Sequence, residues 1–119
     1  DMRLPIRYAL NYPVRYPSKC EKLSISKYSE LTFEAPDMEK FPLLRMAFEA
    51  IAKGGNAACA LNAANEIAVA AFLQEKIRFV DIPHIVAKAI SGNTFVQNPS
   101  YEDYVATNDA IREIAASLI

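Results

Sequence analysis

The sequence predicts a mainly α-helical fold, in which a C-terminal bundle of about four to five helices follows an extended linker with short strand-like pieces. Three observations predict it. Residues 61–73 are strong helix formers without Gly or Pro, and their apolar side chains point in nearly every direction around a helix axis, which is typical of a helix surrounded by others. Apolar stripes at helical spacing lie on both sides of this segment. Before residue 38, prolines and short alternation replace that spacing.

Length and composition indicate one small soluble domain. The chain has 119 residues, of which 52% are hydrophobic and 23% charged, with a formal net charge of −1. Lys and Arg are scattered, so we expect no nucleic-acid partner, which would need a concentrated basic face. No apolar run approaches the roughly 20 residues of a membrane span. Cys20 and Cys59 lie in unlike contexts, which favours two separate thiols and a cytoplasmic setting.

The N-terminal residues 2–11 predict a short helix. Asp1 can cap it, Pro5 is tolerated in its first turn, and Pro13 ends it.

Residues 14–36 predict an extended linker. Pro17 disfavours helix, and short alternation involves Leu23, Ile25, Leu31 and Phe33, which suggests one or two strand-like pieces. Because the segment is too long for a simple connection, we expect it to run along the surface of another domain.

A helix over residues 42–53 follows, because Pro42 suits a first turn. Its apolar stripe is Leu44, Ala47, Phe48 and Ile51. Gly54-Gly55 can supply the positive φ that closes a helix. Asn56 can then cap the central helix, which we expect to continue to about residue 75.

The last third predicts further helices. Asp81 can cap a helix with Pro83 in its first turn, ending at Ser91-Gly92, and residues 93–99 form a loop. Ser100 and Asp103 resemble a capping box. Weak helix formers at 107–109 favour a split into a short helix over 101–106 and a terminal one over 109–118. The expected core stripes are 82/85/86/90 and 111/114/115/118.

A polar cluster lies within the apolar central helix. Asn62 and Glu66 are one turn apart and share a face, and Asn65 lies beside them. Buried amides and carboxylates need hydrogen-bond partners. The cluster can therefore clamp the backbone of a neighbouring loop or contact a polar ligand, and the structural interpretation is favoured because helix-borne amides commonly satisfy a loop's backbone.

Two other features favour ordinary roles. His84, the single histidine, has no Ser, Cys or carboxylate at a spacing typical of a triad or metal site, so we expect a surface or half-buried side chain. Gly54-Gly55 follows no strand and precedes no Lys or Ser/Thr at phosphate-loop positions, so it is interpreted as a helix stop.

Several sequence blocks resemble a known family. The blocks are Asn-Ala-Ala-Asn-Glu at 62–66, Leu-Thr-Phe-Glu-Ala-Pro-Asp at 31–37, Ile-Arg-Phe at 77–79, Asp-Met-Arg-Leu-Pro-Ile at 1–6 and Tyr-Pro at 12–13. In order and spacing they resemble the C-terminal part of the 1-deoxy-D-xylulose 5-phosphate reductoisomerase family. The resemblance runs to about Phe79; beyond that only the general helical pattern fits.

The resemblance implies a place within a larger enzyme. Enzymes of that family use NADPH and Mg²⁺ or Mn²⁺ to convert 1-deoxy-D-xylulose 5-phosphate to 2-C-methyl-D-erythritol 4-phosphate, in the non-mevalonate pathway of isoprenoid biosynthesis. The implied parts are the tail of the catalytic domain (1–13), the linker (14–37) and a C-terminal helical domain (38–119). Because the metal carboxylates and dinucleotide site would lie upstream, no catalytic or metal-binding residue is assigned to this chain.

The resemblance also implies a cofactor-binding role for Met2. In the family, a Pro-Asp-Met segment lies beside the nicotinamide and the substrate, and Asp1-Met2 match its second and third members. The resemblance therefore implies that Met2 walls the nicotinamide or substrate, which suits a polarizable thioether. Ordinary packing at the start of a helix is the alternative.

The expected function is architectural. As part of a homodimeric parent, the helical domain would support the upstream catalytic and NADPH-binding domains without catalysing a reaction itself. The rival hypothesis is a free-standing helical module whose polar cluster and apolar faces bind another protein. The Asp-Met beginning, without an initiator Met, favours the first.

Overall fold

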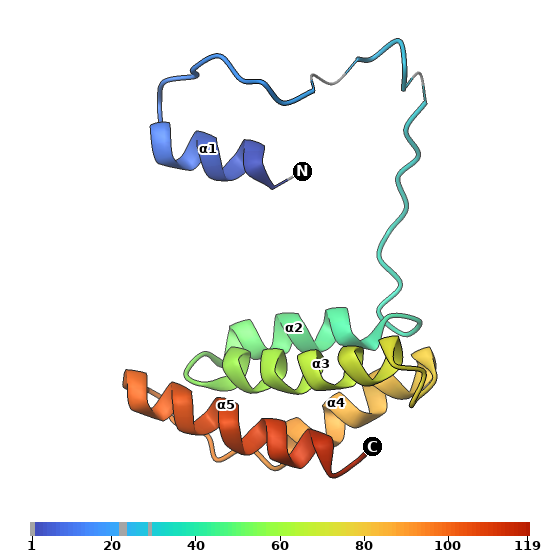
Figure 1. The fold of residues 1–119 in the computed structure, drawn as a ribbon, viewed down its shortest axis with the longest axis vertical. Helices are drawn as coiled ribbons and strands as arrows, with labels where there is room; N and C mark the ends of the chain where they lie inside the picture. Colours follow the sequence, from blue (N-terminus) through green and yellow to red (C-terminus); the bar gives the residue numbers. More distant parts are fainter. Residues whose placement is uncertain (1, 22–23, 29) are drawn as a thin grey trace. The chain divides into compact units, whose positions relative to one another are not determined.

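The structure is a computed structural model that describes residues 2–21, 24–28 and 30–119 (Figure 1). It contains two compact units, 1–34 and 35–119. Over the described ranges the regular structure is entirely helical, with five α-helices and one 3₁₀ turn. The predicted mainly α fold is confirmed.

The first unit contains α1, Arg3–Asn11, close to the predicted 2–11. The proposed cap, Asp1, lies outside the described residues. The segment after the helix folds back onto it: the Arg7 guanidinium donates to the carbonyl of Pro17, and the guanidinium carbon of Arg15 lies 4.4 Å from the Tyr8 ring centroid. These contacts hold the segment around residues 15–17 against α1, although α1 has no buried residue.

The predicted strand-like pieces do not form strands in the described part of the linker. Ile25 lies in a turn, and Leu31 and Phe33 are irregular and exposed, Phe33 to 89%. Leu23 lies outside the described residues. A strand needs a neighbouring strand for its backbone hydrogen bonds, and the described residues provide none.

The second unit is a helical bundle. It consists of α2 (Pro42–Lys53), α3 (Ala57–Leu73), the 3₁₀ turn η1 (Phe79–Asp81), α4 (Ile82–Ser91) and α5 (Tyr101–Ala116). Helix α3 contacts α2, α4 and α5, so the prediction of a central helix is confirmed (Figure 1).

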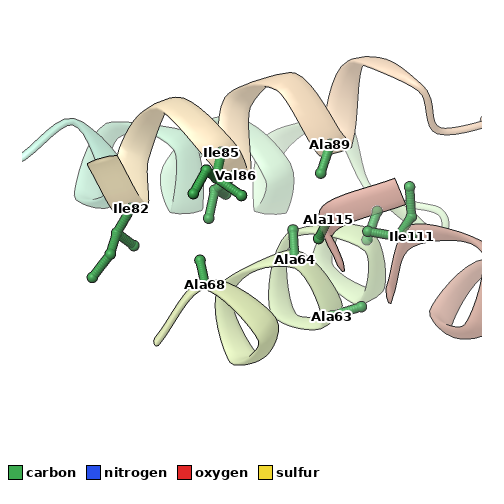
Figure 2. Close-up of a cluster of buried hydrophobic side chains, with 10 residues drawn as sticks. Ala63, Ala64, Ala68, Ile82, Ile85, Val86, Ala89, Ile111 and Ala115 are labelled. Atoms are coloured by element: carbon green, nitrogen blue, oxygen red, sulfur yellow. The ribbon is translucent and has the colours of Figure 1, made fainter. Parts of the chain in front are cut away.

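Small side chains of α3 form the middle of the core. Figure 2 shows branched residues of α4 facing alanines of α3, with α5 closing the cluster. The fully assembled core consists of Ala60, Ala63, Ala64, Ala68, Ile82, Ile85, Val86, Ala89, Ile111 and Ala115. Alanines let the neighbouring helices approach closely, because the separation of two helices depends on the side chains between them. The predicted stripes of the last two helical segments are confirmed.

Helix α2 presents a different face to the core from the one predicted. Leu43 and Met46 pack on the core, whereas Phe48 and Ile51 of the predicted stripe are 57% and 73% exposed. The reason is that α2 is apolar on two adjacent faces. Spacing alone identifies an apolar side, but only contact with α3 selects which part of it is covered.

The predicted split at residues 107–109 is wrong, because α5 is continuous from Tyr101 to Ala116. Thr107 is buried, and Asn108 Oδ1 accepts a hydrogen bond from Arg112 Nε at 3.0 Å. These contacts overcome the weak helix preference of the residues. The predicted capping box is present: Ser100 Oγ accepts from the Asp103 N–H, and the Ser100 N–H donates to Asp103 Oδ2.

The predicted helix ends are partly confirmed. Gly54 and Gly55 have positive φ, 71° and 54°. Asn56 and Asp81 precede α3 and α4 as expected, but neither side chain caps its helix. Asp81 instead accepts hydrogen bonds from the backbone and guanidinium of Arg78. This lowers the pKa of the Asp81 carboxyl to about 2.

Candidate functional site

The most buried polar side chain of the described residues is Asn56, at 0% exposure. Its amide Nδ2 donates to the Thr94 carbonyl and to Thr107 Oγ1, each at 2.9 Å. Its Oδ1 accepts from the Val96 N–H at 3.0 Å, and its own N–H donates to the Val96 carbonyl at 3.1 Å. One side chain thus joins the loop before α5 to α5 itself.

Gly55 allows the 93–96 loop to approach the turn between α2 and α3 closely. A Cβ at this position would lie 2.2 Å from the Val96 carbonyl oxygen. Because no side chain fits at that distance, glycine is required for the 93–96 loop to lie against the α2–α3 turn.

Asn56 performs the backbone-clamping role that the sequence suggested for other asparagines. We predicted Asn56 as a helix cap, since an Asn before a helix usually serves that purpose. Its burial depends on the 93–96 loop, which is 37 to 40 residues away in the chain. The adjacent Gly54-Gly55 was the only local signal that the turn is tightly packed.

The predicted cluster on α3 is brought together in part. Asn62 Nδ2 donates to Glu66 Oε1 at 2.9 Å, and Arg112 of α5 donates to Glu66 Oε2. These bonds lower the pKa of Glu66, the Asn62 hydrogen bond first and the Arg112 hydrogen bond and charge next. Both Asn62 and Glu66 are exposed in this chain. The contact between Glu66 and Arg112 therefore links α3 to α5 at the surface of the unit.

Asn65 faces a groove between α2 and α3, which we call the outer groove. It has a volume of about 460 Å³ and is lined by Leu43, Leu44, Ala47, Ala50, Ile51, Ala58, Leu61, Asn62 and Asn65. Asn65 is half-buried, and within the described residues its side chain makes no hydrogen bond. The groove is therefore apolar, with two amides on its α3 side.

The structure also describes three other residues that the sequence singled out, Met2, His84 and Cys59. Met2 directly precedes α1 and is 69% exposed, so its thioether is available to a partner group. His84 is exposed in the first turn of α4. Burial raises the pKa of the Cys59 thiol, whose Sγ lies 3.5 Å from the Tyr104 carbonyl, and this disfavours the nucleophilic thiolate.

Within the described ranges, no group of three or more His, Cys, Asp or Glu could hold a metal ion. No helix there is long and apolar enough to cross a bilayer. The second unit therefore has two notable features, the buried amide of Asn56 that holds the 93–96 loop and the apolar outer groove. Both are typical of a structural helical domain.

Comparison with known proteins identifies that domain. The family model described as the DXP reductoisomerase C-terminal domain matches residues 1–114, and the chain belongs to this family. Among curated relatives, the 1-deoxy-D-xylulose 5-phosphate reductoisomerases of Bacteroides fragilis and Acetivibrio thermocellus are 47% and 48% identical over 119 residues. The chain spans 31% of the length of each.

Solved structures agree. The reductoisomerase from Zymomonas mobilis in complex with NADPH matches 99% of this chain and 31% of its own, with a TM-score of 0.84 and 46% identity. A DOX-P reductoisomerase in complex with NADPH, fosmidomycin and magnesium matches 98% of this chain and 31% of its own, with a TM-score of 0.76 and 38% identity.

Proposed function

We propose that this chain is the C-terminal part of an NADPH-dependent reductoisomerase that converts 1-deoxy-D-xylulose 5-phosphate to 2-C-methyl-D-erythritol 4-phosphate in isoprenoid biosynthesis. Within that enzyme it is a non-catalytic helical support. The observation that carries this proposal is the family match over residues 1–114, with 47–48% identity to curated reductoisomerases along the whole chain.

We assign three parts of the chain to three parts of the proposed enzyme. Residues 1–13 are assigned to the tail of the catalytic domain, 14–37 to the linker and 38–119 to the C-terminal domain. The exposed apolar side chains of α1, such as Leu4, Ile6 and Leu10, support the first assignment, because such a helix needs an apolar neighbour.

The cofactors are assigned mainly to segments outside this chain. Mg²⁺ or Mn²⁺ needs several oxygen ligands, and the described residues do not offer a suitable group. NADPH supplies the hydride when bound. The exposed thioether of Met2 fits the flat nicotinamide as an apolar wall. The proposed enzyme is a homodimer of the cytoplasm.

Activity assays test the proposal. The full-length protein should oxidise NADPH in the presence of 1-deoxy-D-xylulose 5-phosphate and Mg²⁺, and sedimentation should show a dimer. The 119-residue chain alone should show neither turnover nor sub-micromolar NADPH binding by calorimetry. Tight NADPH binding by the chain would contradict its non-catalytic role, and an inactive full-length protein would contradict the assigned reaction.

A further inference from the structure

The outer groove is an apolar surface that the second unit leaves open. Leu43 and Met46 of α2 already pack on the core. The remaining apolar side of α2 lines the groove through Leu44 and Ile51, both exposed. Phe48 adds a further exposed aromatic ring to the same helix. An exposed apolar patch of this kind is typical of an interaction site.

The polar groups of the groove define what it can bind. None of its lining residues is charged. On α2, Arg45 and Glu49 pair with each other at 3.7 Å, and on α3 the Glu66 carboxylate is paired with Arg112. The amide of Asn65 has no hydrogen-bond partner among the described residues. The complementary occupant is therefore uncharged and apolar, with a donor or acceptor, such as a backbone amide, for Asn65.

We propose that the outer groove seats an uncharged, apolar segment of the catalytic domain that precedes this chain in the same polypeptide. The inference rests on the proposed function, because it needs a longer enzyme of which this chain is the C-terminal part. The matched relatives are about three times as long as this chain, which spans 31% of them. Most of the enzyme is therefore available to fill the groove.

The size of the groove favours a tethered partner over a separate one. Stable association of two separate proteins usually buries about 1,200–2,000 Å² in total. A groove of about 460 Å³ accepts only a few side chains. Covalent linkage places the partner at an effective concentration on the order of millimolar, so a weak contact is populated. A domain of the same polypeptide meets this condition, whereas a second copy of the chain does not.

Thiol accessibility tests the occupant directly. Ile51→Cys places a thiol in the groove, and Glu113→Cys places one on an exposed, charged part of α5. Each variant is made in the 119-residue chain and in the full-length enzyme. The rate of alkylation is measured on the corresponding peptide by mass spectrometry, so Cys20 and Cys59 do not interfere.

The proposal predicts protection only at the groove and only in the full-length enzyme. Ile51→Cys should react roughly tenfold or more slowly there than in the 119-residue chain, since a covered site reacts only when it opens. Glu113→Cys should react equally in both. Equal rates for Ile51→Cys would overturn the proposal. So would protection already present in the 119-residue chain, which would assign the groove to the linker, or protection lost on dilution, which would assign it to a second copy.

Failure of this inference is separable from failure of the proposed function. A full-length protein that catalyses the assigned reaction but leaves Ile51→Cys reactive retains the function and loses the docking site. A full-length protein without the activity contradicts the function itself.

Discussion

The side-chain amide of Asn56 donates a 2.9 Å hydrogen bond to the hydroxyl of Thr107, 51 residues later in the chain. The first residue immediately precedes the central helix α3, and the second lies inside α5. Both side chains are buried. The contact therefore fixes α5 against the start of α3, and it keeps α5 helical through residues that favour caps.

Asn56→Ala should destabilise the chain by about 2–4 kcal/mol, because the Val96 N–H, the Thr94 carbonyl and the Thr107 hydroxyl would lose a buried partner. Urea unfolding followed by circular dichroism measures the change. The control is Asn98→Ala, at an exposed loop position. Equal stability of the two variants would show that water replaces the Asn56 amide.

Gly55→Ala should cost more stability than Gly54→Ala. Both residues have positive φ, so each substitution strains the backbone, by about 1–3 kcal/mol. Only at Gly55 does the new Cβ meet another atom, the Val96 carbonyl oxygen at 2.2 Å; at Gly54 nothing lies within 4 Å. Thermal unfolding of the pair separates backbone strain from steric exclusion. A larger loss at Gly54 would contradict the close approach of the 93–96 loop.

Ser100→Ala should lower stability by about 1 kcal/mol, because it removes the side-chain acceptor for the Asp103 N–H at the start of α5. Ser91→Ala is the matched control. Its hydroxyl donates to the Lys88 carbonyl near the end of α4, where no helix N–H depends on it. Chemical denaturation should therefore leave the control close to wild type, and a similar loss in both would argue against the capping box.

The acid response of the turn before α4 depends on Asp81. Arg78 lowers the pKa of this carboxyl to about 2 from an ordinary value of 3.8. Since the folded-state pKa is the lower one, the contribution of Asp81 is fully present above pH 4. It is lost as the pH falls through about 2.

Carboxyl NMR titration measures this directly. Arg78→Met should return the Asp81 pKa toward 3.8, because the hydrogen bonds from the Arg78 guanidinium disappear while its backbone N–H remains. An unchanged Asp81 pKa in Arg78→Met would contradict the pairing.

Asn65→Leu should behave differently in the chain and in the full-length enzyme. In the 119-residue chain the change should be within about 0.5 kcal/mol of neutral, because Asn65 makes no side-chain hydrogen bond among the described residues. In the full-length enzyme it should destabilise by about 1–3 kcal/mol, since the docked segment would lose its polar partner.

Thermal melts and steady-state kinetics on the same full-length Asn65→Leu protein separate the two interpretations of the polar cluster. We expect a lowered melting temperature with the substrate and NADPH KM little changed. A normal melting temperature with a large loss of turnover would instead assign Asn65 to ligand binding.

Local patterns predicted the helices well, because helix formation depends on residues within a turn of one another. The segments over 42–53 and 82–91, the Gly54-Gly55 stop and the Ser100–Asp103 capping box all follow from short-range spacing. The Asn62–Glu66 contact also follows from it, since residues four apart share a helix face. One local prediction that failed was the split of α5 at residues 107–109, where a distant contact outweighs local preference.

The sequence by itself determined the helical class, the central position of α3 and the apolar character of α2, because periodicity and residue type carry that information locally. Only the tertiary structure decided which asparagine is the buried clamp and which side of α2 stays open. Asn56 is buried by a loop about 40 residues away in the chain. Ile51 is exposed because Leu43 and Met46 lie on the side of α2 that packs against the core. Burial belongs to the assembled helices, so neither outcome is encoded in any single segment.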